Sequence, residues 1–192
     1  MNRHRAFTLI EIMVVMMIMV MVGLLFAVFI RDSYILYQKG QIQSSVVQET
    51  DALTARIANV LRGTFQVQTA NSTSLTVLAY YAPADTTPTK VTIQRDGANV
   101  TLTTIVGVVS GQTYTYPAGN AKSRIITYHF VSSPSIPLFR YYDESNTLLS
   151  GSINVTGVHL IEVTSTLYSP QNTTKTAVAS TKIELRNLKT NL

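Results

Sequence analysis

The chain has 192 residues and a net charge of +5, and it contains no cysteine. This composition excludes a disulfide framework, so the fold must be held by packing alone. The basic residues are spread thinly along the chain and form no cluster interleaved with aromatic residues, so the charge is not the signature of a nucleic-acid-binding protein.

The first 30 residues join a short basic leader, residues 1–6, to a long apolar run. From residue 7 to residue 30 the only charged residue is Glu11. A helix over this run spans roughly 36 Å, enough to cross a hydrocarbon core of about 30 Å. A cleavable secretory signal has a shorter apolar region, and residues 23–30 contain no small-residue cleavage site. A signal anchor explains the length of the run but does not explain Glu11.

The junction Ala6-Phe7-Thr8-Leu9-Ile10-Glu11 resembles the class III signal of type IV pilins and pseudopilins. The resemblance implies that a prepilin peptidase cuts between Ala6 and Phe7. It also implies that Phe7 becomes the N-methylated first residue and that Glu11 is the fifth residue of the mature chain. The family usually has Gly before the cut, where this chain has the small residue Ala6.

The carboxylate of Glu11 needs a partner, because an ionisable group inside a membrane segment is costly. Cleavage creates a cationic amine at Phe7 that can compensate it. Within one helix the two residues lie about 6 Å apart along the axis, so an intramolecular pair is one alternative. The family resemblance implies the other, a pair between Glu11 and the amine of a neighbouring subunit that sets the register of packed helices.

The helix is expected to continue as an amphipathic segment through residues 31–63. Gly63, directly after Arg62, predicts its end. Gly23 and Gly40 lie inside the helix and mark either a bend or a place of close packing. The apolar stripe that predicts a core-facing side consists of Ile35, Ile42, Val46, Leu53, Ile57 and Val60.

From Thr64 onward the apolar residues alternate with polar ones, and Thr, Val, Ile and Tyr dominate, which indicates strands. Asp96-Gly97 predicts a hairpin between two of them. The predicted strands are Thr64–Ala70, Leu75–Tyr81, Thr89–Arg95, Asn99–Val106, Arg124–Val131, Leu138–Tyr142, Val158–Tyr168 and Ala177–Leu188. The predicted loops are Ala82–Pro88, Gly107–Ser123, Ser132–Pro137, Asp143–Gly157 and Ser169–Thr176.

A long N-terminal helix followed by an antiparallel sheet is an α+β architecture, and it resembles the pilin fold. The expected organisation is a leader over 1–6, a transmembrane helix over 7–30, its amphipathic continuation over 31–63 and a β-rich head over 64–192. Three later segments look like those of the larger minor subunits, the PilW-type minor pilins and J-type minor pseudopilins. They are Ile126–Phe130, Leu138–Tyr141 and Glu184–Leu188.

The remaining candidate sites are weak. His129 and His159 fall inside predicted strands, where a histidine is usually a half-buried structural residue. Asp143-Glu144-Ser145-Asn146 lacks the ligand spacing of a calcium loop and is expected to be a turn. Tyr114-Thr115-Tyr116-Pro117 falls in a predicted loop and is the best candidate for an exposed contact patch. Sequons at Asn71, Asn99, Asn154 and Asn172 suit glycosylation only in a host with that machinery, and a Thr-rich chain also produces them by chance.

These features predict a minor pilin-like structural subunit of a type IV pilus-like filament, at or near its tip, with no enzymatic activity, cofactor or metal. The alternatives are a pseudopilin of a type II secretion system and a DNA-uptake pilin. The expected partners are prepilin peptidase, other pilin subunits, an inner-membrane assembly platform and, before assembly, membrane lipid; DNA or a surface ligand has no support in the sequence. Arg3 and Arg5 predict a cytoplasmic N-terminus and an external head.

Overall fold

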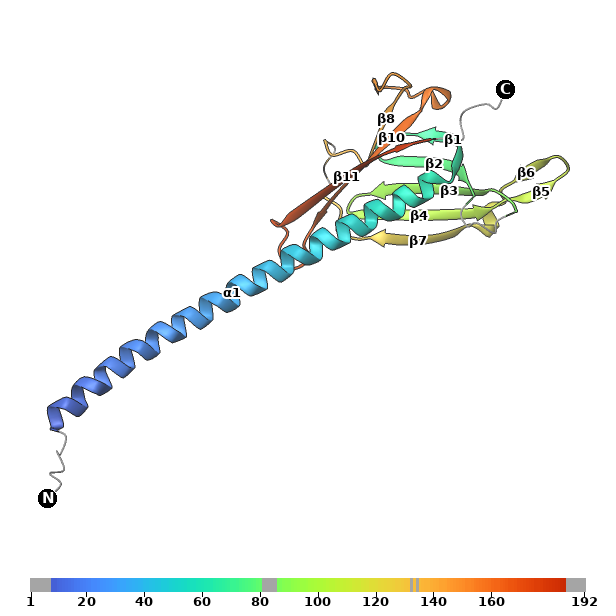
Figure 1. Ribbon diagram of the computed structural model, residues 1–192. Helices are drawn as coiled ribbons and strands as arrows, with labels where there is room; N and C mark the ends of the chain where they lie inside the picture. The colour runs from blue at the N-terminus through green and yellow to red at the C-terminus, as the bar shows by residue number, and fades with distance from the viewer. Residues whose placement is uncertain (1–7, 81–85, 132, 134, 186–192) are drawn as a thin grey trace. The chain divides into compact units, whose positions relative to one another are not determined.

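A computed structural model describes residues 8–80, 86–131, 133 and 135–185 of the chain. The chain divides into two compact units, Met1–Ile42 and Gln43–Leu192. One long helix, α1 (Leu9–Arg62), runs through the division, and all the strands belong to the second unit (Figure 1). An N-terminal apolar helix followed by antiparallel sheets confirms the predicted α+β class.

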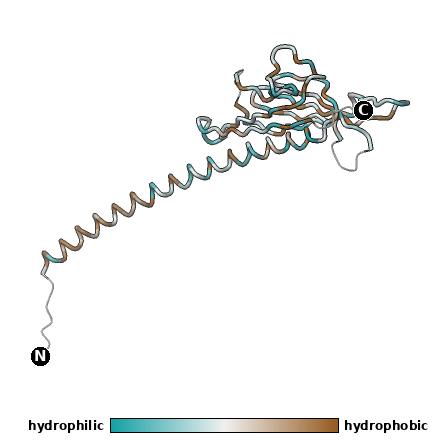
Figure 2. The backbone as a smooth tube through the Cα atoms, turned by 45° about the horizontal axis from the view of Figure 1, so that its top comes forward, coloured by the Kyte–Doolittle hydropathy of each residue, from teal (hydrophilic) through white to brown (hydrophobic). Residues whose placement is uncertain are grey.

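The part of α1 in the first unit is solvent-exposed from Leu9 to Gln41. Figure 2 shows that its early turns are the most hydrophobic part of the helix. Farther along, polar side chains pair at a spacing of four residues. Gln38 donates a hydrogen bond to the Tyr34 hydroxyl at 2.8 Å, and Gln41 donates one to the Tyr37 hydroxyl at 3.0 Å. Such pairs lie on one face of a helix and add modestly to its stability.

The second unit contains a five-stranded antiparallel sheet in the order β1-β2-β3-β4-β7 (Figure 1). The hairpin predicted from Asp96-Gly97 is confirmed, since Asp96 pairs with Asn99 and Gly97 has a φ of 60°, which favours glycine. The strands are β1 (Thr64–Ala70), β2 (Ser74–Ala79), β3 (Thr89–Asp96), β4 (Asn99–Val106) and β7 (Lys122–Thr127).

A second, four-stranded antiparallel sheet has the order β11-β10-β8-β9. Its strands are β8 (Phe139–Tyr142), β9 (Leu148–Leu149), β10 (Leu160–Tyr168) and β11 (Thr176–Glu184). The single sheet expected from the sequence is therefore two main sheets. The chain passes between them at a bend after β7, because Phe130 leaves the first sheet and forms a bridge with Leu167 of β10.

This bend corrects the predicted strand Arg124–Val131, which begins two residues earlier and ends at Thr127. The predicted loop Gly107–Ser123 is also wrong in part. It contains a two-stranded hairpin, β5 (Val108–Ser110) and β6 (Thr113–Thr115), and a short 3₁₀ turn, η1 (Ala118–Asn120). Likewise β9 and a second 3₁₀ turn, η2 (Val155–Gly157), lie within the predicted loop Asp143–Gly157. These elements are too short to leave a periodic pattern in the sequence.

Several predictions fall on residues outside the described part of the chain. They are the leader with Ala6 and Phe7, Tyr81 with part of the loop Ala82–Pro88, part of the loop Ser132–Pro137, and Arg186–Leu188 at the end of the last predicted strand.

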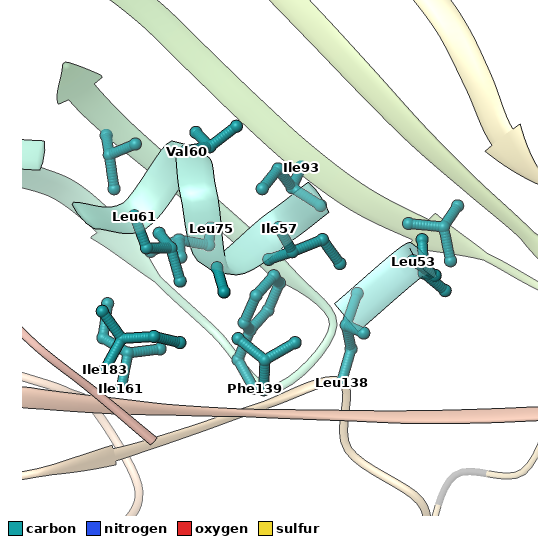
Figure 3. Close-up of a cluster of buried hydrophobic side chains, with 14 of the residues drawn as sticks. Leu53, Ile57, Val60, Leu61, Leu75, Ile93, Leu138, Phe139, Ile161 and Ile183 are labelled. Carbon is teal, nitrogen blue, oxygen red and sulfur yellow. The ribbon is translucent and has the colours of Figure 1, made fainter. Parts of the chain in front are cut away.

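The core of the second unit joins the last turns of α1 to both sheets. Figure 3 shows Ile57 among apolar side chains that include Leu75 and Ile93 of the first sheet, Phe139 and Ile161 of the second, and Leu138 just before β8. All of these side chains are buried. Burial of apolar surface in one continuous cluster is the main force that holds the head to this part of the helix.

The buried face of α1 begins later than the predicted stripe. Ile35 is exposed and Ile42 is half-buried, whereas Val46 is buried. Two threonines missed by the stripe belong to the buried face. The Thr50 hydroxyl donates to the Val46 carbonyl at 2.6 Å, and the Thr54 hydroxyl donates to the Thr50 carbonyl at 2.9 Å. A hydroxyl satisfied by its own helix can be buried at little cost.

The helix ends at Arg62, directly before Gly63 as predicted, but the reason for the glycine is different. Its φ is not in the left-handed region that a C-terminal glycine cap uses. A Cβ atom at Gly63 would lie 2.7 Å from the carbonyl oxygen of Tyr80. The glycine therefore permits close approach of the helix end to the end of β2. In contrast, α1 runs through Gly23 and Gly40 without interruption.

Candidate functional site

The apolar segment of α1 is the most unusual surface of the chain. Its large hydrophobic side chains between Leu9 and Ile30 are all substantially exposed. In the described residues α1 is the helix that is long and apolar enough to cross a membrane. Soluble proteins rarely expose contiguous apolar surface of this extent, so the segment is suited to lipid or to other apolar helices.

Glu11 lies in the first turn of this helix. The turn begins at Thr8, whose hydroxyl and carbonyl oxygens accept hydrogen bonds from the backbone N–H of Glu11 at 3.4 and 3.1 Å. Thr8 is thus the N-cap, and Glu11 occupies the third helical position, where a carboxylate interacts favourably with the helix dipole. The Thr-x-x-Glu spacing therefore has a local role that the sequence analysis did not identify, in addition to any role between subunits.

The structure brings Thr8 and Glu11 together but leaves the other two predicted residues, Ala6 and Phe7, outside the described part of the chain. Glu11 itself is exposed. A carboxylate on the surface of an apolar segment must meet a polar partner once lipid or other helices surround it. The pairing of Glu11 with the amine of Phe7 remains a prediction.

The head contains a polar contact between α1 and the end of β7 that sequence reasoning missed. The Thr127 hydroxyl donates to Glu49 Oε1 at 2.9 Å, and Nδ1 of His129 lies 3.3 Å from the same oxygen. The His129 ring packs edge-on against Tyr168, with 5.7 Å between ring centres. No local pattern connects residues this far apart in the sequence, so only the tertiary structure could identify the contact.

Both head histidines were predicted to lie in strands, but in the structure each lies just outside the nearest strand. His129 follows the bend after β7. His159 precedes β10, and its backbone N–H donates to the Tyr142 carbonyl at 2.9 Å. The predicted structural role fits both residues.

A second polar network lies on the four-stranded sheet around Glu162. The Tyr142 hydroxyl donates to one carboxylate oxygen, and the Ser180 hydroxyl donates to the other at 3.0 Å. The Tyr142 hydrogen bond is the largest cause of a lowered pKa of Glu162; the Ser180 hydrogen bond and the charges of Arg140 and Lys182 also lower it, while burial opposes them. All of these groups belong to adjacent strands, so the network stabilises strand pairing.

The predicted tyrosine patch is only partly correct. Tyr114 lies on β6 and is exposed, but the Tyr116 ring packs against Gly107 and its hydroxyl is buried without a hydrogen-bond partner among the described residues. Burial is the main cause of a raised pKa of Tyr116, with smaller contributions from Tyr114 and Tyr80. The two tyrosines therefore differ, since only Tyr114 presents its side chain as an exposed residue.

Asp143–Asn146 forms the predicted turn. The Asp143 carboxylate accepts the backbone N–H of Thr147 at 2.7 Å, and Asn146 has a positive φ. In the part of the chain that the structure describes, no three His, Cys, Asp or Glu side chains gather as metal ligands would.

Residues 1–27 match the family model described as the prokaryotic N-terminal methylation motif. The match covers the leader and most of the apolar segment, including Glu11. A search of curated proteins finds no match to the sequence.

Proposed function

Because the chain carries the class III signal that is the signature of type IV pilins and pseudopilins, we propose that it is a minor pilin-like structural subunit, located at or near the tip of a type IV pilus-like filament. The observation that supports this best is the coincidence of the methylation motif with the exposed apolar segment of α1 that begins at Thr8 and bears Glu11. The signal implies processing by prepilin peptidase and assembly with other pilins.

In this proposal the peptidase cuts between Ala6 and Phe7 and methylates the new amine. Arg3 and Arg5 hold the N-terminus in the cytoplasm, and the head lies outside. The apolar segment remains in lipid until the inner-membrane assembly platform adds the subunit to the filament. There, other apolar helices replace lipid around it.

Glu11 pairs with the N-terminal amine of a neighbouring subunit. The two residues are four apart in the sequence, and neither charge would have water to solvate it once apolar helices are packed around it. An uncompensated charge at the centre of a membrane helix costs about 2.5–3.5 kcal/mol on insertion scales. A subunit packed out of register would leave both charges unpaired, so the pair selects one register.

The head serves as the part of the subunit that is displayed. The head carries a five-stranded and a four-stranded sheet, and from this size we infer a tip or priming role. Glu49 contacts the end of β7, and Glu162 bonds to side chains on the neighbouring strands, so both carboxylates stabilise the fold, which supports a structural and non-catalytic head. A secretion pseudopilin would carry the same signal, and the neighbouring genes distinguish the two systems.

Mass spectrometry of the mature N-terminus tests the processing step. We expect a chain that begins with N-methylated Phe7. An intact Met1 on membrane-inserted protein would overturn the proposal and leave a simple signal anchor.

Substitution of Glu11 tests the assembly step. Glu11→Ala should leave the protein inserted, cleaved and methylated but absent from sheared filaments. Asp32→Ala is the matched control, because Asp32 is an exposed acid on the same helix outside the apolar segment, and its carboxylate lies 3.4 Å from the side chain of the adjacent Arg31. Normal incorporation of Glu11→Ala, or equal loss in the control, would refute the role of Glu11.

A further inference from the structure

The structure separates the four Asn-x-Ser/Thr sequons by their surroundings. Asn99 begins β4, and the next residue, Val100, is completely buried. Asn71 is exposed, but the carbonyl of the next residue, Ser72, accepts the backbone N–H of Leu138 at 2.9 Å, which fixes the backbone of this sequon against the segment that leads into β8. A transferase must enclose the acceptor side chain together with the following two residues, so neither site suits modification of the folded head.

Asn172 is different, because it lies in the connection between β10 and β11, where residues 171–174 are all exposed. The backbone N–H of Asn172 donates to the Ser169 carbonyl at 3.2 Å, and its carbonyl accepts from Lys175 N–H at 2.9 Å. These bonds hold the connection as a compact projecting turn. The sequon Asn172-Thr173-Thr174 is therefore both accessible and ordered.

Within this turn Thr174 donates twice to the Asn172 side chain. Its backbone N–H lies 3.1 Å from Oδ1 of Asn172, and its hydroxyl lies 2.6 Å from the same atom. Loss of a proton from Nδ2 would place negative charge on Oδ1, where both donors stabilise it. The contacts therefore favour the form of the amide whose nitrogen can act as a nucleophile.

Asn154 accepts similar hydrogen bonds from the backbone N–H and hydroxyl of Thr156, at 3.2 and 2.8 Å, but its sequon is part of the packed structure of the head. It caps η2, and the middle residue of its sequon, Val155, packs against the core. Residues 171–174 have no such role. Asn172 is thus the sequon that joins accessibility to the favourable side-chain geometry.

We propose that Asn172 is the acceptor of an N-linked oligosaccharide donated by an isoprenoid diphosphate-linked sugar. Nδ2 of Asn172 loses a proton to a base of the transferase and bonds to the anomeric carbon of the sugar. The bond from that carbon to the diphosphate breaks, and the diphosphate leaves with the electron pair. The proposal rests on the proposed function, because such transferases act on the external face of the membrane and therefore need an external head.

Glycopeptide mass spectrometry of the protein purified from its native cells tests the proposal. Combined digestion with trypsin and chymotrypsin releases Ser169–Lys175, which contains Asn172 and none of the other sequons. We expect this peptide to carry sugar on Asn172, and the peptide that contains Asn99 to be bare. The intact mass of the same purified protein, measured before digestion, reports the mature N-terminus.

A methylated Phe7 together with an unmodified Asn172 would refute glycosylation at Asn172 and leave the proposed function intact. An unprocessed N-terminus would count against both. Sugar found on Thr173 or Thr174 in place of Asn172 would also overturn the proposal.

Two variants at one position test whether modification of Asn172 depends on the Thr174 hydroxyl. Thr174→Val removes the hydroxyl donor and should reduce the Asn172 glycopeptide to background, whereas Thr174→Ser keeps a hydroxyl and should retain it. Both changes lie in an exposed turn, so the head should fold in each case. Equal occupancy in the valine variant and the native chain would contradict the role of Thr174.

Discussion

Ile57→Ala is the substitution that most directly tests the attachment of α1 to the head. Ile57 is 1% exposed and lies among side chains of both sheets (Figure 3). Loss of its apolar atoms removes their transfer free energy and leaves a cavity, for which buried Ile→Ala changes cost about 2–5 kcal/mol. We take ~3 kcal/mol as the central value. For a unit of this size, that corresponds to a fall in Tm of about 6–12 °C.

Urea unfolding of the full chain in detergent, followed by near-ultraviolet circular dichroism of the tyrosines, measures this loss. The signal reports on the head, because Tyr141 is buried in its core and donates to the Asn71 carbonyl at 2.8 Å. Ile35→Ala is the matched control, since Ile35 lies on the same helix but is 39% exposed. A loss below about 1 kcal/mol for Ile57→Ala, or an equal loss in the control, would refute the inferred core.

Four further substitutions have expected results of different sign. Ser165→Ala should raise the free energy of unfolding by about 1 kcal/mol in the same assay, because the buried Ser165 hydroxyl has no hydrogen-bond partner among the described residues; a destabilised variant would indicate a missed partner. Gly63→Ala should destabilise the head, because the new Cβ would lie 2.7 Å from a carbonyl oxygen. At Gly40 an added Cβ meets nothing within 4 Å, so Gly40→Ala should raise thermal stability, because alanine has a higher helix propensity than glycine by about 1 kcal/mol. A higher melting temperature for Gly63→Ala than for Gly40→Ala would contradict this prediction. In the folded state the pKa of Glu162 is held below its usual value, mainly by the Tyr142 hydrogen bond. The contribution of Glu162 to the free energy of unfolding is therefore complete above the unfolded-state pKa, and it is lost as the pH falls through the folded-state pKa. Tyr142→Phe should weaken that acid dependence in urea titrations at successive pH values, and an unchanged dependence would exclude the hydrogen bond as its cause.

The long elements were predictable because their patterns are local. The predicted bounds of β1 and β4 match the structure at both ends, and Asp96-Gly97 located the hairpin. Buried residues alternate along the first half of β4, whereas in β1 they recur every third position because its pairing with β2 is irregular. Strands β5, β6 and β9 were not predictable, because two or three residues cannot display a period. Thr50 and Thr54 were missed for another reason. Their hydroxyls are polar in the sequence but are satisfied by the helix itself, which allows them to join the core.

By itself the sequence identified the N-terminal methylation motif and the apolar segment that follows it. The basic leader, Thr8, Glu11 and the apolar run lie next to one another in the chain, so their chemistry is readable without a fold. Only the tertiary structure decided which distant residues meet. It divided the strands into two sheets, joined Glu49 to Thr127 and His129, and placed the Asn172 sequon in an exposed, ordered turn while burying the residue beside Asn99. Such contacts depend on burial and chain reversal between distant segments, which no local pattern encodes.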